Sequence, residues 1–179
     1  MSRFQITDLP LAGLKLIERK PIGDHRGFLS RIFCAEELQS AGWDLPTAQI
    51  NHTYTAKKGT VRGLHFQHSS YAEKKLVNCL RGDIWDVVVD LRQNPLTFLK
   101  WHAEYLSAEN HRALLIPEGF AHGFQVMTDD VEMLYLHSAI YHAEAEDGLN
   151  VADPTLSINW PLSITEQSER DKNHPMITE

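Results

Sequence analysis

The sequence predicts an all-β protein, either a sandwich or a barrel, because short strand-like runs separated by turn residues dominate the middle of the chain. The clearest run covers residues 84–91 and is rich in β-branched and aromatic residues, which favour strands. It follows a second apolar run at residues 76–80, and the intervening Arg81-Gly82-Asp83 predicts that the two runs form a β-hairpin. Strands and helices do not alternate along the chain, so we do not expect a doubly wound α/β sheet.

Further strands are expected along most of the chain. They cover residues 26–33, 49–54, 60–67, 111–116, 123–127 and 132–138. Helical signals are fewer: residues 35–41 predict a short helix that ends at Gly42, and one or two turns can form after Ser168. Because no repeat, low-complexity tract or flexible linker divides the chain, we expect a single domain over residues 1–179.

Charge and composition argue against several classes of protein. The formal net charge of −7 disfavours broad nucleic-acid binding, although a local cluster of cationic side chains can still hold an anionic small molecule. The two cysteines, Cys34 and Cys79, provide neither a disulfide framework nor a CxxC motif, which is typical of a cytosolic protein. The first residues do not form a secretory signal, and no apolar run approaches the roughly 20 residues of a membrane span. We therefore expect a soluble, cytoplasmic protein with no nucleic-acid or membrane partner.

Reactive side chains are densest between residues 61 and 67, where Arg62, His65 and Gln67 lie on one expected strand. Regular pleating places Gly63, His65 and Gln67 on one face and Arg62 on the other. The pattern leaves open whether a bulge at Gly63 turns Arg62 toward the same side as His65.

A second histidine follows the expected turn at Pro117 and Gly119. His122 then lies where the chain re-enters a sheet. Two histidine-bearing strands in one small β-protein predict a shared polar cavity.

The P-x-G-x-x-H spacing that ends at His122 also occurs in metal-binding cupins, so a metal site has to be weighed. A divalent metal needs three or four converging ligands, and the candidates are His65, His68, Glu73 and His122. The usual His-x-His pair is absent, and on one strand His65 and His68 would point to opposite faces. We therefore expect no metal, and a metal-dependent cupin remains the alternative from another class.

Several ordered motifs together resemble those of one known family. They cover residues 24–28, 49–52, 61–67, 75–77, 86–92, 116–124, 134–135, 160–161 and 168–171. On these motifs the chain resembles the dTDP-4-dehydrorhamnose 3,5-epimerase family over roughly residues 14–175. The resemblance implies a cupin-type jelly-roll β-barrel with a few short peripheral helices. It also implies a homodimer with N-terminal strand exchange, and neither a cofactor nor a metal.

The resemblance also implies roles for individual residues. His65 matches the family's catalytic base, Asp171 its carboxylate partner, Lys75 a cation at the ketone oxygen and Tyr135 the proton donor. Implied substrate contacts are Arg26, Phe28, Gln49, Asn51, Arg62, His122, Tyr141, Glu146 and Arg170, of which Arg26 and Phe28 would cross into the site of the neighbouring subunit.

These residue types suit proton transfer beside a ketone. A 4-keto group acidifies the hydrogens on C3 and C5, and histidine side chains ordinarily titrate near neutral pH. A carboxylate fixes the imidazole tautomer, a lysine stabilises the enolate oxygen, and a tyrosine on the opposite face returns the proton with inversion. No redox change occurs, and the chain has no GxGxxG dinucleotide fingerprint.

We therefore expect an epimerase that acts at C3, C5 or both of a nucleoside-diphosphate 4-keto-6-deoxy sugar. A GDP-heptose or a CDP- or UDP-linked 4-keto sugar is an alternative substrate, and a catalytically silent sugar-binding barrel is an alternative function. The sequence departs from the family pattern at Arg31, at Arg170 and by one extra residue between Asn51 and Arg62. These departures leave the nucleotide open, because arginine and lysine are not equivalent at a phosphate and a glutamate-to-arginine change reverses a charge.

Overall fold

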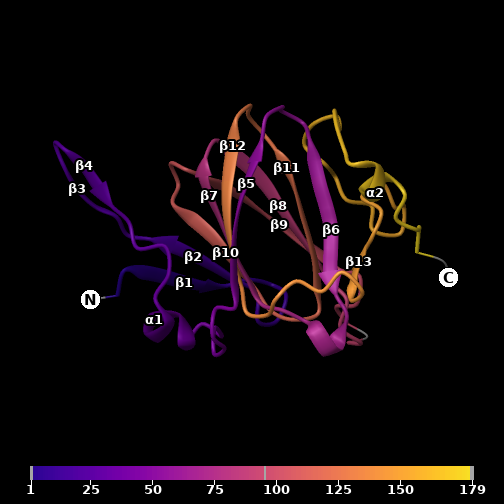
Figure 1. The fold of residues 1–179 in the computed structure, drawn as a ribbon, viewed down its shortest axis with the longest axis horizontal. Helices are drawn as coiled ribbons and strands as arrows, with labels where there is room; N and C mark the ends of the chain where they lie inside the picture. The colour runs from indigo at the N-terminus through magenta and orange to yellow at the C-terminus, as the bar shows by residue number, and fades with distance from the viewer. Residues whose placement is uncertain (1, 95, 178–179) are drawn as a thin grey trace.

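Two antiparallel sheets form the body of the protein in the computed structural model, which describes residues 2–94 and 96–177 (Figure 1). The first sheet has the order β1 (Phe4–Asp8), β2 (Lys15–Arg19), β10 (Arg112–Ile116), β7 (Lys75–Arg81), β12 (Val131–His137) and β5 (Gln49–Thr55). The second has the order β13 (Glu146–Gly148), β6 (Val61–Gln67), β11 (Phe120–Val126), β8 (Asp83–Asp90) and β9 (Trp101–Ser107). Helices are short and peripheral: α1 (Ala35–Gln39), a 3₁₀ turn (Ser69–Tyr71) and α2 (Glu169–Lys172). The predicted all-β barrel of cupin type is confirmed.

The main core lies between the two sheets. Val77 and Met133 reach it from the first sheet, whereas Val88 and Phe124 reach it from the second. Because alternate residues of a strand point to opposite faces, each strand contributes every second side chain to this core. Among the described residues, no helix combines the length and the apolar character needed to cross a bilayer.

The predicted hairpin of residues 76–91 is wrong, although both of its strands exist. β7 pairs with β10 and β12 in the first sheet, whereas β8 pairs with β11 and β9 in the second. The chain changes sheet at Gly82, which has a φ of +73° and whose added Cβ would lie 2.5 Å from Thr128 Oγ1. A glycine that permits this backbone conformation allows a corner between sheets as readily as a hairpin turn.

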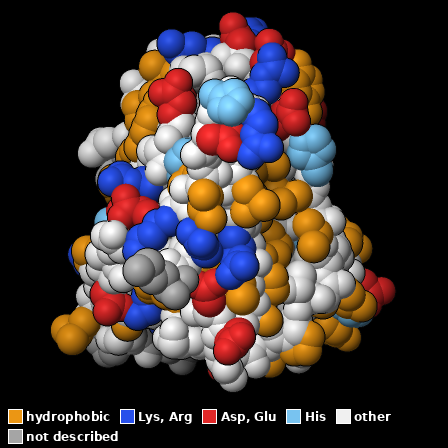
Figure 2. All heavy atoms as spheres, turned by 90° about the vertical axis from the view of Figure 1, so that its left-hand side faces the viewer, with side chains coloured by type: hydrophobic (Ala, Val, Ile, Leu, Met, Phe, Trp, Pro, Cys, Tyr) orange, Lys and Arg blue, Asp and Glu red, His pale blue; other side chains and the backbone are white. Residues whose placement is uncertain are grey.

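The single strand predicted at residues 26–33 is also wrong. The chain instead forms a small hairpin of β3 (Ile22–Asp24) and β4 (Gly27–Leu29), which we call the arm and which projects from the barrel (Figure 1). Asp24 stabilises its turn by accepting hydrogen bonds from the backbone and the guanidinium of Arg26. Phe28 and Leu29 are each 67% exposed. Figure 2 views the molecule from the side of the arm and shows hydrophobic side chains interspersed with charged ones on this face.

Candidate active site

A cavity of about 700 Å³ lies between the two sheets. Strands β5, β7 and β12 of the first sheet and β6 and β11 of the second contribute to its walls, together with the segment that leads into α2. Eleven of the thirteen predicted site residues line it: Gln49, Asn51, Arg62, His65, Lys75, His122, Tyr135, Tyr141, Glu146, Arg170 and Asp171.

A histidine–carboxylate pair forms one wall of the cavity. His65 Nε2 lies 2.8 Å from Asp171 Oδ1, and the Gly63 amide donates to Asp171 Oδ2 at 3.1 Å. Ser168 caps α2 by accepting from the Asp171 backbone N–H, which fixes the start of the helix. Burial by itself would raise the pKa of the Asp171 carboxyl, but the hydrogen bonds from His65 and Gly63 outweigh it and lower that pKa. Asp171 is therefore a carboxylate that accepts a hydrogen bond from Nε2–H of His65, which leaves Nδ1 as the nitrogen with the free lone pair.

A bulge in β6 brings Arg62 and His65 to the same cavity. The β6–β11 register pairs His65 with His122 but Arg62 with Phe124, so two residues of β6 oppose one of β11. The bulge falls at Gly63, where φ is +117° and an added Cβ would lie 2.6 Å from Gly123 Cα. This geometry answers the question that the strand pattern left open. Regular pleating would have separated the two side chains.

Tyr135 reaches the cavity from β12 of the first sheet, whereas His122 reaches it from β11 of the second sheet, directly opposite His65 on β6. The Tyr135 side chain is buried, with its ring centroid 6.1 Å from that of His122. Burial raises the pKa of the Tyr135 hydroxyl well above its ordinary value, so the hydroxyl remains a proton donor. His122 Nε2 lies 2.7 Å from Oδ1 of the fully buried Asp86. Burial raises the pKa of Asp86, partly offset by the contact with His122.

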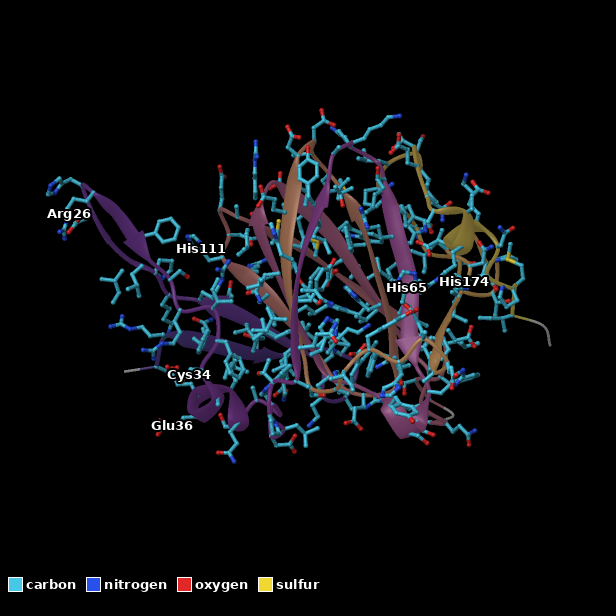
Figure 3. All side chains as sticks on the ribbon, viewed as in Figure 1. Arg26, Cys34, Glu36, His65, His111 and His174 are labelled. Carbon is cyan, nitrogen blue, oxygen red and sulfur yellow. The ribbon has the colours of Figure 1, made fainter. Side chains whose placement is uncertain are left out.

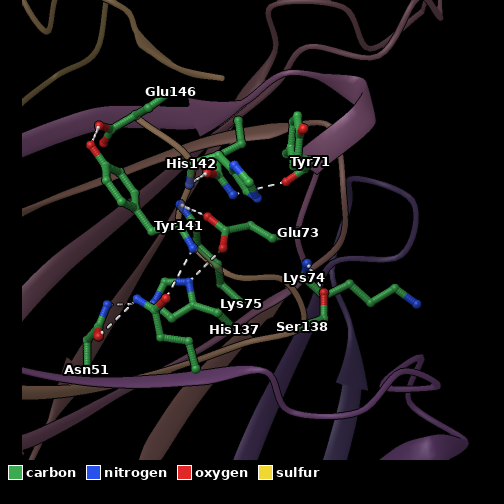
Figure 4. A network of polar contacts seen from close by, with 12 residues as sticks. Asn51, Tyr71, Glu73, Lys74, Lys75, His137, Ser138, Tyr141, His142 and Glu146 are labelled. Atoms are coloured by element: carbon green, nitrogen blue, oxygen red, sulfur yellow. Dashed lines mark hydrogen bonds and ion pairs between the residues drawn. The ribbon is translucent and has the colours of Figure 1, made fainter. Parts of the chain in front are cut away.

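Lys75 completes the polar wall together with two residues that were not predicted as catalytic or substrate-binding (Figure 4). Its Nζ lies 3.4 Å from Glu73 Oε1, and His137 Nδ1 lies 2.8 Å from Glu73 Oε2. His137 follows Tyr135 by two positions on the same strand, so the period of β12 could have placed both in the cavity. His174 was not predicted at the site either, and it does not line the cavity, but its Nε2 lies 3.8 Å from Asp171 Oδ1.

The remaining lining residues form contacts at the rim. Glu146 accepts from the Tyr141 hydroxyl at 2.7 Å and pairs with Arg170 at 2.6 Å. Burial would raise the pKa of Glu146, but its contacts with Arg170 and Tyr141 lower it. Gln49 donates to Asn51 Oδ1 at 3.1 Å.

Arg26 and Phe28 are not brought to this cavity. Both belong to the arm, and Figure 3 shows Arg26 at the opposite end of the molecule from His65. The Phe28 ring packs edge-on against His111, with 5.5 Å between centroids. Arg31 is also outside the cavity lining and pairs with Glu37 at 2.5 Å.

The four residues considered as cupin-type metal ligands do not converge. His68 pairs with Asp147 at 3.1 Å, whereas Glu73 and His122 have the partners described above. Within residues 2–94 and 96–177, the side chains that lie close enough together to hold a metal ion are those of His65, Asp171 and His174. The arrangement needed for the metal-dependent alternative is therefore not formed by those four side chains.

A β-barrel cavity with a carboxylate-bound histidine on one sheet and a buried tyrosine and a lysine on the other defines an acid–base isomerase of the epimerase class. A family model described as dTDP-4-dehydrorhamnose 3,5-epimerase matches residues 8–179. The chain is 41% identical to the dTDP-4-dehydrorhamnose 3,5-epimerase of Sinorhizobium fredii, over 100% of this chain and 92% of that protein. The chain belongs to the dTDP-4-dehydrorhamnose 3,5-epimerase family, as its motifs predicted.

Solved structures agree with this assignment. The Bacillus anthracis dTDP-4-dehydrorhamnose 3,5-epimerase, crystallised with TDP and PPi bound, has a TM-score of 0.93 and 36% identity, covering 97% of this chain and 99% of that one. The Legionella pneumophila dTDP-6-deoxy-D-glucose-3,5-epimerase, in complex with dTDP-4-keto-L-rhamnose, has a TM-score of 0.91 and 38% identity. Its alignment covers 97% of this chain and 92% of that chain.

Proposed function

We propose that this protein converts dTDP-4-keto-6-deoxyglucose to dTDP-4-dehydrorhamnose by inverting C3 and C5. The observation that carries the proposal is the placement of a base and an acid on different sheets. His65 lies on β6 of the second sheet and Tyr135 on β12 of the first, and both line the same cavity. A sugar ring held between them presents opposite faces to the two groups.

The proposed reaction proceeds through an enolate. His65 removes the hydrogen beside the ketone, and the electron pair of that C–H bond passes to the ketone oxygen. Lys75 stabilises the negative charge that develops there. Tyr135 then protonates the same carbon from the other face, after which the tyrosinate regains a proton and His65 loses its own. Asp171 orients His65 and stabilises the imidazolium.

The proposal of a dTDP-linked substrate is supported by the ligands of the related structures, which are TDP with PPi and dTDP-4-keto-L-rhamnose. In this chain, Arg62 and Arg170 line the cavity and can face a diphosphate. Both guanidinium groups are thus available at the cavity although the protein as a whole is acidic.

Product analysis tests the proposed function. Purified protein is incubated with dTDP-4-keto-6-deoxyglucose, the ketone is reduced, and the sugar configuration is read by NMR. We expect the L-rhamno product. Inversion at C3 alone or at C5 alone would restrict the proposed activity to that one carbon. GDP-, CDP- and UDP-linked 4-keto sugars are assayed in parallel. Turnover of one of these alone would overturn the nucleotide assignment, and turnover of none would overturn the epimerase proposal.

We further propose a homodimer in which the arm of one subunit completes the cavity of the other. Support comes from the exposure of Phe28 and from the position of Arg26, which points away from its own barrel (Figure 3). Mixing His65→Ala and Arg26→Ala chains tests it, because a mixed dimer combines an intact cavity with an intact arm from the other chain. Recovery of activity in the mixture is expected. No recovery, with mixed dimers demonstrated by native mass spectrometry, would overturn arm exchange.

We also propose that the protein acts in the cytoplasm. Cys34 and Cys79 are both free, which fits a reducing compartment. Fractionation of cells that express the full chain would place the activity with the cytoplasmic fraction, and recovery from a membrane or extracellular fraction would contradict this.

A further inference from the structure

A network of side chains beside Lys75 has no part in the mechanism above (Figure 4). Lys75 on β7 and His137 on β12 are directly opposite each other in the first sheet, and Gln49 on β5 is opposite His137 on its other side. Glu73 lies just before β7, with only 9% of its side chain exposed. A carboxylate this deeply buried requires partners, and its two oxygens face Lys75 and His137.

The two contacts of Glu73 differ in strength. The His137 Nδ1–Glu73 Oε2 distance of 2.8 Å is that of a short charge-assisted hydrogen bond. The Lys75 Nζ–Glu73 Oε1 distance of 3.4 Å is long for an ion pair between two buried groups. Glu73 is therefore held firmly by the imidazole and only loosely by the ammonium.

The hydrogen-bond pattern also fixes the tautomer of His137. Burial would raise the pKa of Glu73, but the hydrogen bond from His137 and the charge of Lys75 lower it, so Glu73 is a carboxylate that can only accept. Nδ1 of His137 must then donate. Nε2 lies 3.4 Å from Asn51 Nδ2, so in the neutral imidazole it is placed to accept from the amide. Gln49 donates in turn to Asn51 Oδ1, which extends the chain of contacts across β5, β12 and β7.

We propose that Glu73 and His137 are positioning residues for Lys75, with His137 restraining Glu73. This inference rests on the proposed role of Lys75 at the ketone oxygen. Glu73 directs the buried Lys75 side chain, while the short bond from His137 prevents the Glu73 carboxylate from closing on Lys75. The ammonium therefore retains N–H groups for the enolate. Without His137, Glu73 would compete with the enolate for the same protons.

A double-mutant cycle tests this coupling. His137→Ala and Glu73→Gln, alone and combined, are assayed on dTDP-4-keto-6-deoxyglucose for kcat, KM and solvent deuterium incorporation. Because each change disturbs a hydrogen bond to a charged group, each should lower kcat about 10- to 100-fold, with KM within about threefold of the wild-type value. In the Glu73→Gln background, His137→Ala should change kcat by less than about threefold, because no carboxylate remains to be restrained. Multiplicative losses would overturn the inference.

Two further variants separate positioning from general damage. His137→Asn keeps an N–H donor near the Nδ1 position and should restore most of the activity lost in His137→Ala. Glu132→Gln is the matched control, because Glu132 also pairs with a histidine, His52, at 3.0 Å, but at an exposed site on β12 and β5. Its kcat should remain within about twofold of wild type. Equal losses in Glu132→Gln and Glu73→Gln would also overturn the inference.

A measurement without turnover distinguishes failure of this inference from failure of the proposed function. ¹⁵N NMR of the imidazoles should show His137 protonated at Nδ1 in the wild-type chain, with a clear change in Glu73→Gln. If the wild type epimerises its substrate but His137 is protonated only at Nε2, the inference fails and the proposed function stands. If no substrate turns over, the proposed function fails and takes the proposed role of Lys75 with it.

Discussion

Replacing Asp171 with asparagine removes one negative charge from the pair with His65 while leaving the side-chain shape almost unchanged. Both carboxylate oxygens are in use, since Oδ1 accepts from His65 and Oδ2 accepts from the Gly63 amide. Asparagine has one acceptor oxygen and one NH₂ donor. The Gly63 amide can only donate, so the asparagine oxygen must face Gly63 and its NH₂ group must face His65 Nε2.

As a consequence, the His65 imidazole changes tautomer. In the Asp171→Asn protein, Nε2 of His65 has to accept, and the ring proton moves to Nδ1, the nitrogen that is free to act as the base in the wild type. The imidazolium also loses its neighbouring charge. For a carboxylate that fixes a catalytic imidazole, the expected loss in kcat is on the order of 10³- to 10⁴-fold. Loss of the charge-assisted bonds should also lower the free energy of unfolding by about 1–3 kcal/mol.

Steady-state kinetics on dTDP-4-keto-6-deoxyglucose measure this effect, with circular dichroism to verify that the variant is folded. The matched control is Asp147→Asn, because Asp147 also pairs with a histidine, His68, but at an exposed site. We expect the control to stay within about twofold of wild type. A folded Asp171→Asn protein with kcat within about tenfold of wild type would refute the reasoning from hydrogen-bond geometry.

Three further predictions concern stability. Gly63→Ala should lower the free energy of unfolding by about 2–4 kcal/mol in urea titrations, because its Cβ would meet Gly123 backbone atoms at a positive φ; a loss below about 0.5 kcal/mol would contradict the bulge. The pKa of Asp171 is lowered in the fold, since the bonds from His65 and Gly63 outweigh burial. The ionised Asp171 therefore stabilises the folded protein fully at pH values above its ordinary pKa of 3.8. This contribution is lost as the pH falls through the lowered pKa of the folded state. The free energy of unfolding should therefore decrease less steeply with falling pH in Asp171→Asn than in the wild type. An identical decrease in both proteins would contradict the lowered pKa of Asp171. Burial raises the pKa of Tyr135 above its ordinary value of 10.0, so wild-type stability should fall as pH rises above that value, and Tyr135→Phe should reduce the fall; equal alkaline slopes would count against a buried hydroxyl.

Local sequence signals predicted where strands lie along the chain better than they predicted which strands pair with each other. The positions of β5, β6, β10 and β12 were close to those expected, because strand-forming residues and flanking turns determine them locally. Strand pairing depends on contacts between residues that are far apart in the sequence. For this reason, the turn at Gly82 was predicted to connect a hairpin, although it connects strands of two different sheets. Strands β1, β2, β9 and β13 were missed, and the three-residue length of β13 gives no periodicity to detect.

The same distinction applies to the site. Motifs placed His65 and Asp171 in one site although they are 106 positions apart, and the structure brings them into hydrogen-bond contact. Strand pattern could not decide the side to which Arg62 points, since a one-residue bulge reverses it. His137 could have been found from its spacing to Tyr135. The strand pattern around Arg26 predicted one strand rather than a projecting hairpin, and only the family resemblance indicated that Arg26 belongs outside the cavity of its own chain.

Solvent deuterium incorporation tests most directly the central claim that His65 removes the hydrogens beside the ketone. The wild-type protein and His65→Asn are incubated in D₂O with dTDP-4-keto-6-deoxyglucose, and the sugar is examined by mass spectrometry and NMR. We predict deuterium at both C3 and C5 with the wild-type protein and none above background with His65→Asn. Wild-type levels of incorporation in a folded His65→Asn protein would contradict the claim.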